Sequence, residues 1–179
     1  FNAHIINKKG IDLLIGDDLS IKNIKELILK FAKLKEPVLI TGETGTGKEL
    51  AARAIHFLSG RREKPILTVN LAVLPETLIE SELFGHEKGA FTGADKMKKG
   101  FFEIAHKGTI FIDELQNMST YVQSKLLRAV EEKKICHVGS TQPLETDVRI
   151  IVASNTDIKQ DIKAKKFRED LYYRLNEFL

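Results

Sequence analysis

The hydrophobic positions of this chain fall into short continuous runs, separated by longer segments with a helical period. Four runs have the length of a strand: 38–40, 66–69, 109–112 and 148–153. Apolar residues recur at helical spacing in the segments 20–35, 48–58, from about 75, 119–130, 157–165 and 167–175. Continuous apolar runs are typical of parallel strands that are buried on both faces. Strands that alternate with helices therefore predict an α/β fold, with a parallel sheet flanked by helices.

Two segments interrupt this alternation. Residues 85–99 are rich in glycine and charge, which predicts a loop insertion. Residues 135–144 predict a hairpin insertion that turns at Gly139. The weak pattern over residues 1–14 indicates a lead-in segment, and we expect one α/β nucleotide-binding domain over residues 15–179.

The composition of the chain mainly excludes certain classes of protein. The 179 residues are 42% hydrophobic and 30% charged, which fits a single packed domain. No run approaches the ~20 apolar residues of a membrane helix, so we expect no membrane partner. The net charge of +3 is mild for a dedicated nucleic-acid domain. A single cysteine and five histidines without metal-ligand spacing favour a cytoplasmic protein without its own zinc site. Because the chain opens on Phe1, we expect a fragment.

A glycine-rich motif follows the first strand run. Its residues are Gly42, Glu43, Thr44, Gly45, Thr46, Gly47 and Lys48. This G-x-x-x-x-G-K pattern lies between a predicted strand and a predicted helix, the context in which it binds nucleotide phosphates. Backbone N–H groups, a helix N-terminus and the lysine ammonium all attract phosphate, so ATP is the predicted cofactor. An ordinary glycine-rich turn is the alternative. Glu49 stands where a serine or threonine usually meets Mg²⁺, and its carboxylate can serve that ion directly or through water.

Two carboxylates end the third strand run. Asp113 and Glu114 are expected at the carboxyl edge of the sheet, where ligands bind in open α/β folds. Asp113 is predicted to orient Mg²⁺ through its waters, and Glu114 to act as the general base for an attacking water. The alternative is a strand end at which Asp113 only caps the following turn.

Two amides are expected at the same edge. Asn70 follows the second strand run, and its amide could hold the carboxylate of Glu114 until nucleotide arrives. Asn155 follows the fourth run and could contact the γ-phosphate. A turn-forming Asn70 and a merely polar strand end at Asn155 are the alternatives.

The loop insertion carries a more specific pattern. Its residues Gly89, Ala90, Phe91, Thr92, Gly93 and Ala94 resemble the GAFTGA segment of bacterial sigma-54-dependent transcriptional activators, the NtrC-like branch of the AAA+ ATPases. The phosphate loop with Glu49, the strand 148–155 and the segment 167–175 resemble that family's phosphate loop, sensor I strand and arginine-finger segment. The resemblance extends from about residue 15 to residue 176. It implies a P-loop NTPase fold of AAA+ type with a parallel sheet of about five strands.

The resemblance also implies an activity. It implies an ATPase ring, a hexamer or heptamer, with ATP and Mg²⁺ at sites shared between subunits. Glu114 and Asn70 would form a glutamate switch, while Arg168 and Arg174 would reach the neighbour's γ-phosphate. The loop 89–94 would contact sigma-54 RNA polymerase holoenzyme and remodel its closed complexes, supported by the hairpin. DNA would be bound through a separate domain, and the helical lid would lie beyond this chain.

The residues alone leave other interpretations open. Phe91 could fold back into the core, and two arginines six residues apart could be an ion-paired helix face. Leu71 stands where the family commonly has a cysteine, which we interpret as packing. A P-loop kinase and an ATP-gated assembly module without turnover remain alternative functions.

Overall fold

A four-stranded parallel sheet forms the centre of the molecule. The computed structural model describes residues 18–176. Within them the strand order is β1-β8-β5-β2. The strands are β1 (Val38–Thr41), β2 (Ile66–Asn70), β5 (Thr109–Asp113) and β8 (Arg149–Ser154). All four predicted runs are confirmed as parallel strands of one sheet. The five-stranded sheet implied by the resemblance is wrong for the described residues, because they contain only four core runs and all four are used.

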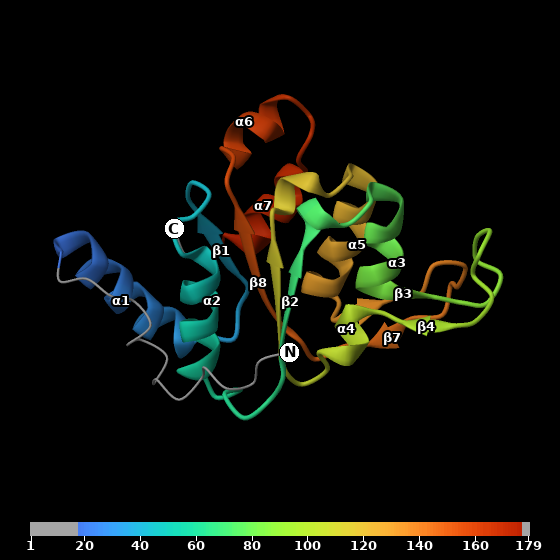
Figure 1. The fold of residues 1–179 in the computed structure, drawn as a ribbon, viewed down its shortest axis with the longest axis horizontal. Helices are drawn as coiled ribbons and strands as arrows, with labels where there is room; N and C mark the ends of the chain where they lie inside the picture. The colour runs from blue at the N-terminus through green and yellow to red at the C-terminus, as the bar shows by residue number, and fades with distance from the viewer. Residues whose placement is uncertain (1–17, 177–179) are drawn as a thin grey trace.

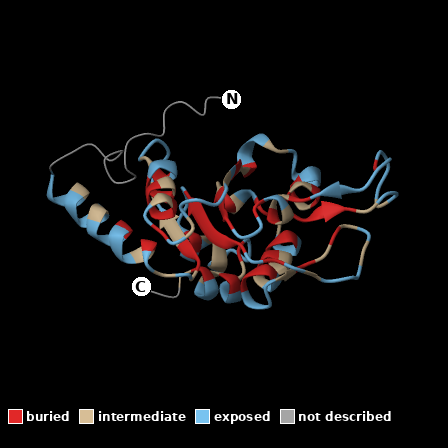
Figure 2. Cartoon of the chain, turned by 90° about the horizontal axis from the view of Figure 1, so that it is seen from below, coloured by how far each residue is buried: buried red, intermediate tan, exposed pale blue. Residues whose placement is uncertain are grey.

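Helices cover both faces of this sheet (Figure 1). One layer is α1 (Leu19–Ala32) with α2 (Lys48–Phe57), and the other is α3 (Glu76–Phe84), α5 (Thr120–Glu131) and α7 (Glu169–Leu175). The side chains of β5 alternate between the layers, since Phe111 packs toward α1 and α2 while Ile110 and Ile112 pack toward the other layer. Figure 2 shows the buried strands between helices whose outer faces are exposed. Every described helix is too short or too polar to span a bilayer.

The predicted helices lie where the structure has them, but their first and last residues differ. Helix α1 has Asp18 as its N-cap and ends at Ala32, earlier than the predicted residue 35. Helix α5 begins after Ser119, whose Oγ accepts the N–H of Val122 at 3.4 Å. The short helices α4 (Phe101–Ile104) and α6 (Ile158–Lys163), and the single turns η2 (Leu71–Val73) and η3 (Leu115–Asn117), complete the helices of the described region. Only α6 among these four was predicted, because one-turn helices carry too few residues to show a period.

The two insertions lie side by side. The loop insertion is a hairpin of β3 (Gly85–His86) and β4 (Lys98–Lys99), and the second hairpin is β6 (Lys134–Ile135) with β7 (Leu144–Glu145). The N–H of Glu87 donates to the carbonyl of Val138 at 3.0 Å, and the N–H of Val138 donates to that of Gly85 at 2.9 Å. Both predicted insertions are therefore confirmed, and backbone hydrogen bonds join them.

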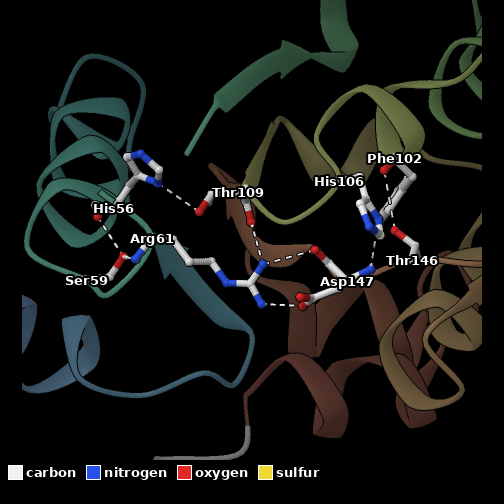
Figure 3. A network of polar contacts seen from close by, with 9 residues as sticks. His56, Ser59, Arg61, Phe102, His106, Thr109, Thr146 and Asp147 are labelled. Atoms are coloured by element: carbon white, nitrogen blue, oxygen red, sulfur yellow. Dashed lines mark hydrogen bonds and ion pairs between the residues drawn. The ribbon is translucent and has the colours of Figure 1, made fainter. Parts of the chain in front are cut away.

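A polar network ties together the amino edge of the sheet (Figure 3). Arg61 follows α2, donates to the carbonyls of Gly108 and Asp147 at 3.0 Å each, and pairs with the Asp147 carboxylate. His56 is fully buried with its Nδ1 2.9 Å from Thr109 Oγ1. Burial lowers the pKa of His56, so this ring stays neutral under conditions that would protonate a free histidine. The network holds α2 against the starts of β5 and β8.

His137 links the insertions to α4. Its Nδ1 lies 2.7 Å from a Glu87 oxygen and its Nε2 lies 2.8 Å from a Glu103 oxygen, with only 7% of the side chain exposed. Burial by itself would lower the pKa of His137. The hydrogen bonds and charges of Glu103 and Glu87 outweigh burial, so the pKa is raised overall. His137 between two carboxylates thus clamps the base of both insertions, and its raised pKa favours the imidazolium form.

We expect this clamp to make stability depend on pH. Because the folded pKa of His137 lies above the unfolded value, its stabilisation is complete below about pH 6.5 and declines as pH rises through the folded pKa. Replacing His137 with Gln should therefore lower the free energy of unfolding more at about pH 6 than at about pH 9. Urea unfolding across this range measures the difference. The contribution of His56 to the pH dependence cancels because both proteins contain this residue. His106→Gln, at an exposed position, is the control. A difference that stays constant with pH would contradict the clamp.

Candidate active site

The phosphate loop folds around the ammonium group of its own lysine. Lys48 Nζ donates to the carbonyls of Gly42 and Glu43 at 2.8 Å each, and Lys48 is 7% exposed. Gly45 and Gly47 have φ of 83° and 87°, the left-handed region that glycine adopts without steric cost. Gly47 is also the N-cap of α2, so the positive end of that helix faces the loop. The backbone therefore has the conformation that the motif predicts.

Asp113 lies within the electrostatic reach of Lys48 and of two further carboxylates, Glu49 and Glu114. The Asp113 carboxylate accepts the N–H of Glu114 at 2.9 Å. Burial raises the pKa of Asp113, and the charges of Glu114 and Glu49 raise it further against the opposing effects of that N–H and of Lys48. Glu49 itself pairs with Arg53 at 2.7 Å, one turn along α2. Excess negative charge of this kind attracts a cation.

The same residues fit a magnesium ion that keeps most of its own waters. Within residues 18–176 no group of three or more His, Cys, Asp or Glu side chains is arranged to hold a metal. Mg²⁺ is commonly bound by one or two carboxylates together with phosphate oxygens and water. Asp113, at the end of a buried strand, can supply one such carboxylate. Because Glu49 is engaged by Arg53, it is the weaker of the two candidates for contact with the ion.

Glu114 has an unusual backbone conformation. Its φ of 59° and ψ of 48° lie in the left-handed region, which costs a non-glycine residue roughly 1–2 kcal/mol. The turn is closed by the N–H of Asn117, which donates to the Glu114 carbonyl at 3.0 Å. Strain at the end of a core strand is characteristic of functional sites, and the carboxylate here contacts Gln116 in η3 and Asn155 just after β8.

Side-chain amides connect the phosphate loop to the acidic strand end. Asn155 Nδ2 donates to Thr44 Oγ1 at 3.1 Å and to a Glu114 oxygen at 3.3 Å. Gln116 Nε2 donates to the other Glu114 oxygen and to Asn155 Oδ1, the latter at 2.7 Å. The structure thus brings Asn155 into the site as predicted. Gln116 was missed, and its only signal in the sequence is a polar side chain in the turn that follows the two acids.

Asn70 lies at the predicted carboxyl edge of the sheet, but its side chain contacts a residue other than Glu114. In the pairing of β2 with β5 it stands opposite Asp113. Its Oδ1 accepts the N–H of Ala72 at 2.8 Å and so caps η2. The Glu114 carboxylate is held by Gln116 and Asn155 instead. The predicted contact between Asn70 and Glu114 is therefore wrong for this structure, since the short asparagine side chain bonds to its own turn, which was the alternative interpretation.

The two arginines are ion-paired on the surface of α7. Arg168 pairs with Asp170 through two hydrogen bonds of 3.0 and 2.6 Å, and Arg174 donates to Glu131 at 2.6 Å. Arg174 lines a pocket of about 410 Å³ together with Arg61 and other residues from the amino edge of the sheet. Because the phosphate loop lies at the carboxyl edge, Arg174 is on the opposite side of its own subunit.

The GAFTGA segment is a closed loop with an exposed tip. The N–H of Gly89 donates to the carbonyl of Ala94 at 2.8 Å, and the N–H of Ala94 donates to that of Phe91 at 3.0 Å. Phe91 is 39% exposed and packs edge-on against His86, with ring centroids 4.9 Å apart. Thr92 is exposed, so Phe91 and Thr92 form the tip rather than part of the core. Ala94 is 5% exposed. Its side chain is turned inward where the loop closes, and contact of Ala94 with a partner stays a prediction.

Comparison with known proteins matches this geometry to one family. Residues 14–179 match the family described as Sigma-54 interaction domain. The chain belongs to that family. This sigma-54 interaction domain has the α/β P-loop NTPase fold.

Individual relatives agree with the assignment. The domain is 50% identical over 163 residues to the transcriptional regulatory protein ZraR of Escherichia coli K12, covering 91% of this chain and 37% of that protein. It is 49% identical over 165 residues to the Nif-specific regulatory protein of Azotobacter vinelandii, covering 92% and 32%. The crystal structure of NtrX from Brucella abortus in complex with ATP superposes with a TM-score of 0.85 at 36% identity, covering 92% of this chain and 35% of that one. The sigma-54 interaction domain thus spans about a third of the length of these relatives.

The contact made by Asn70 generates a prediction about stability. Asn70→Ala should lower the free energy of unfolding by about 1 kcal/mol, because the N–H of Ala72 loses its partner. Asn70→Ser should retain most of the stability, since a serine oxygen can cap the same turn. Urea unfolding without nucleotide measures both variants. Equal losses for alanine and serine would show that the cap is not what the side chain contributes.

Proposed function

We propose that this sigma-54 interaction domain binds ATP with Mg²⁺ and hydrolyses it in a ring of like subunits to remodel sigma-54 RNA polymerase. One observation carries the proposal. The phosphate loop and the acidic end of β5 meet at one edge of the sheet, and hydrogen bonds run from Thr44 through Asn155 to Glu114. A nucleotide seated on the loop would have its γ-phosphate beside these side chains.

Binding would use groups that the loop already presents. The N–H groups around Gly45 and the start of α2 attract phosphate oxygens, and Lys48 can exchange its two carbonyl partners for the β- and γ-phosphates. The ATP complex of NtrX, which has the same fold at 36% identity, supports this assignment. Asp113 would orient Mg²⁺ through water, and the ion, when bound, offsets the negative charge of the phosphates.

Hydrolysis would use Glu114 as the base. An attacking water gives a proton to the Glu114 carboxylate while the oxygen of the water bonds to the γ-phosphorus. At the same time the bond between the γ-phosphorus and the β–γ bridging oxygen breaks. The products are ADP and phosphate. Asn155, which now donates to Thr44, would donate to the γ-phosphate instead.

Ring formation would complete the site. Arg174 lies at the edge of its own sheet opposite the phosphate loop, so its guanidinium can act on a nucleotide only in a neighbouring subunit. Arg168, at the N-cap of α7, is the second candidate for this role. Both side chains are exposed enough to exchange their present carboxylate partners for phosphate. Hexamer and heptamer are the expected forms.

The loop 89–94 would contact sigma-54 and transmit the movement driven by ATP hydrolysis. Its tip, Phe91 and Thr92, is exposed on a loop closed at its base, a form suited to pressing an aromatic side chain into a protein surface. The family to which the chain belongs is described by its interaction with sigma-54. We assign DNA contact to a separate domain of the whole protein.

We expect hydrolysis to need both Glu114 and an arginine from a neighbour. In the full-length protein, Glu114→Gln should lower kcat about 10²–10⁴-fold while ATP affinity stays near normal. Arg174→Ala should lower kcat by about 10³-fold and abolish a steep dependence of specific activity on protein concentration. Arg128→Ala is the matched control, because Arg128 also forms an exposed ion pair, with Glu132 at the C-cap of α5. Phosphate release and calorimetric ATP binding supply the readouts. ATP binding without any turnover would favour an assembly module, and transfer to an acceptor without free phosphate would favour a kinase.

Contact with sigma-54 should depend on the loop tip alone. Thr92→Ala and Phe91→Ala should weaken binding to sigma-54 by at least about tenfold and leave ATP hydrolysis nearly unchanged. Met97→Ala tests specificity, since Met97 is 52% exposed in the same insertion but outside the tip. Binding is measured by anisotropy of labelled sigma-54 with a nucleotide analogue. Loss of binding and hydrolysis together would count against a dedicated contact loop.

A further inference from the structure

Gln116 occupies a central place in the active site that the proposed mechanism leaves unused. It lies in η3, directly after the end of β5, and is partly buried. Its Nε2 donates to Glu114 and to Asn155, while its Oε1 accepts from Ser154 Oγ at 3.0 Å. One amide group thus joins the general base, the amide nearest the phosphate loop and the last residue of β8.

The hydrogen bonds fix which way the amide points. Ser154 is fully buried, and its Oγ lies 3.0 Å from Gln116 Oε1 and also contacts Thr156. Because a carboxylate only accepts, the NH₂ group of Gln116 must face Glu114, and the amide oxygen therefore faces Ser154. Both of its N–H bonds are used, one by Glu114 and one by Asn155. The side chain is held in a single orientation.

The Glu114 carboxylate is correspondingly occupied. One of its oxygens accepts from Gln116 and the other accepts from Asn155 at 3.3 Å. A general base needs an oxygen within hydrogen-bond reach of the water that it deprotonates. Each oxygen keeps a second lone pair, so the two bonds do not exclude a water, but they hold the carboxylate in one orientation, turned to Gln116 and Asn155. Asn70, whose Oδ1 is used by Ala72, does not provide the restraint.

We propose that Gln116 is a positioning residue that holds Glu114 in a resting arrangement until a nucleotide draws Asn155 away. The inference rests on the proposed ATPase function. Asn155 also donates to Thr44 in the phosphate loop, so a γ-phosphate that takes up this N–H removes one of the two acceptors that hold Gln116 in place. The loss of the Asn155 contact then frees Gln116, and Gln116 in turn frees the carboxylate of Glu114. Occupancy of the phosphate loop is thereby coupled to the readiness of Glu114.

The test separates the hydrogen bonds of Gln116 from its volume. Gln116→Met keeps a side chain of similar length and removes every hydrogen bond, and Gln116→Glu keeps the acceptor while placing a second carboxylate beside Glu114. In the full-length protein we expect Gln116→Met to bind ATP about tenfold more tightly, because the nucleotide no longer has to break the restraint, while kcat at saturating ATP changes less than about twofold. Gln116→Glu should gain less affinity, since its carboxylate repels the phosphates. Gln160→Ala, at an exposed position of α6, should match the wild type.

Each result decides the matter. An unchanged ATP affinity would overturn the proposal, and so would a fall in kcat at normal ATP affinity, which would place Gln116 among groups that organise the reactive state. Parallel losses of kcat, ATP affinity and melting temperature would reveal a purely structural role. These outcomes are distinct from failure of the proposed function, in which the wild type itself would release no phosphate. A crystal structure of nucleotide-free Gln116→Met with Glu114 turned away from Asn155 would support the restraint directly, and an unmoved Glu114 would contradict it.

Discussion

The parallel register of β1, β8 and β5 is the constraint on which the site depends. Thr41 stands opposite Ser154, and Ile112 stands opposite Val152. The N–H of Gly42 continues this pairing into the phosphate loop by donating to the Ser154 carbonyl at 3.2 Å. The first residues beyond the three strands are therefore neighbours, which brings the loop, Asn155 and the acids to one edge. A shift by one residue would reverse the side-chain faces of a strand and separate these groups.

Much of this arrangement follows from the sequence because it depends on burial and backbone geometry. Strands covered on both faces must be apolar throughout, so the four core runs are visible in the chain itself. The phosphate loop is recognisable because its glycines are needed at fixed spacing: Gly45 and Gly47 adopt positive φ. Loop and acids could be placed at one edge from the rule that parallel strands share a carboxyl end.

The individual contacts could not be predicted in the same way. Gln116 reaches Asn155, which is 39 residues away in the chain, and no spacing rule selects that partner among the polar residues of the edge. Asn70 had two plausible uses, and the local one prevailed because capping Ala72 needs no movement of another element. Ala94 turned inward because the loop closes through its backbone, a feature of tertiary contact rather than composition. The fifth strand was carried over from the family resemblance, not from a run of apolar residues in the described part of the chain.

The close approach of Gly139 to Ala90 has a mechanical consequence. A Cβ at position 139 would lie 2.9 Å from the Ala90 Cβ, and the glycine φ of 83° adds to the restriction. With two backbone hydrogen bonds beside this contact, the loop and the second hairpin share one stiff base. A displacement of that base would move both insertions together. The two insertions are therefore joined at their base into one unit, and this joining depends on a residue without a side chain.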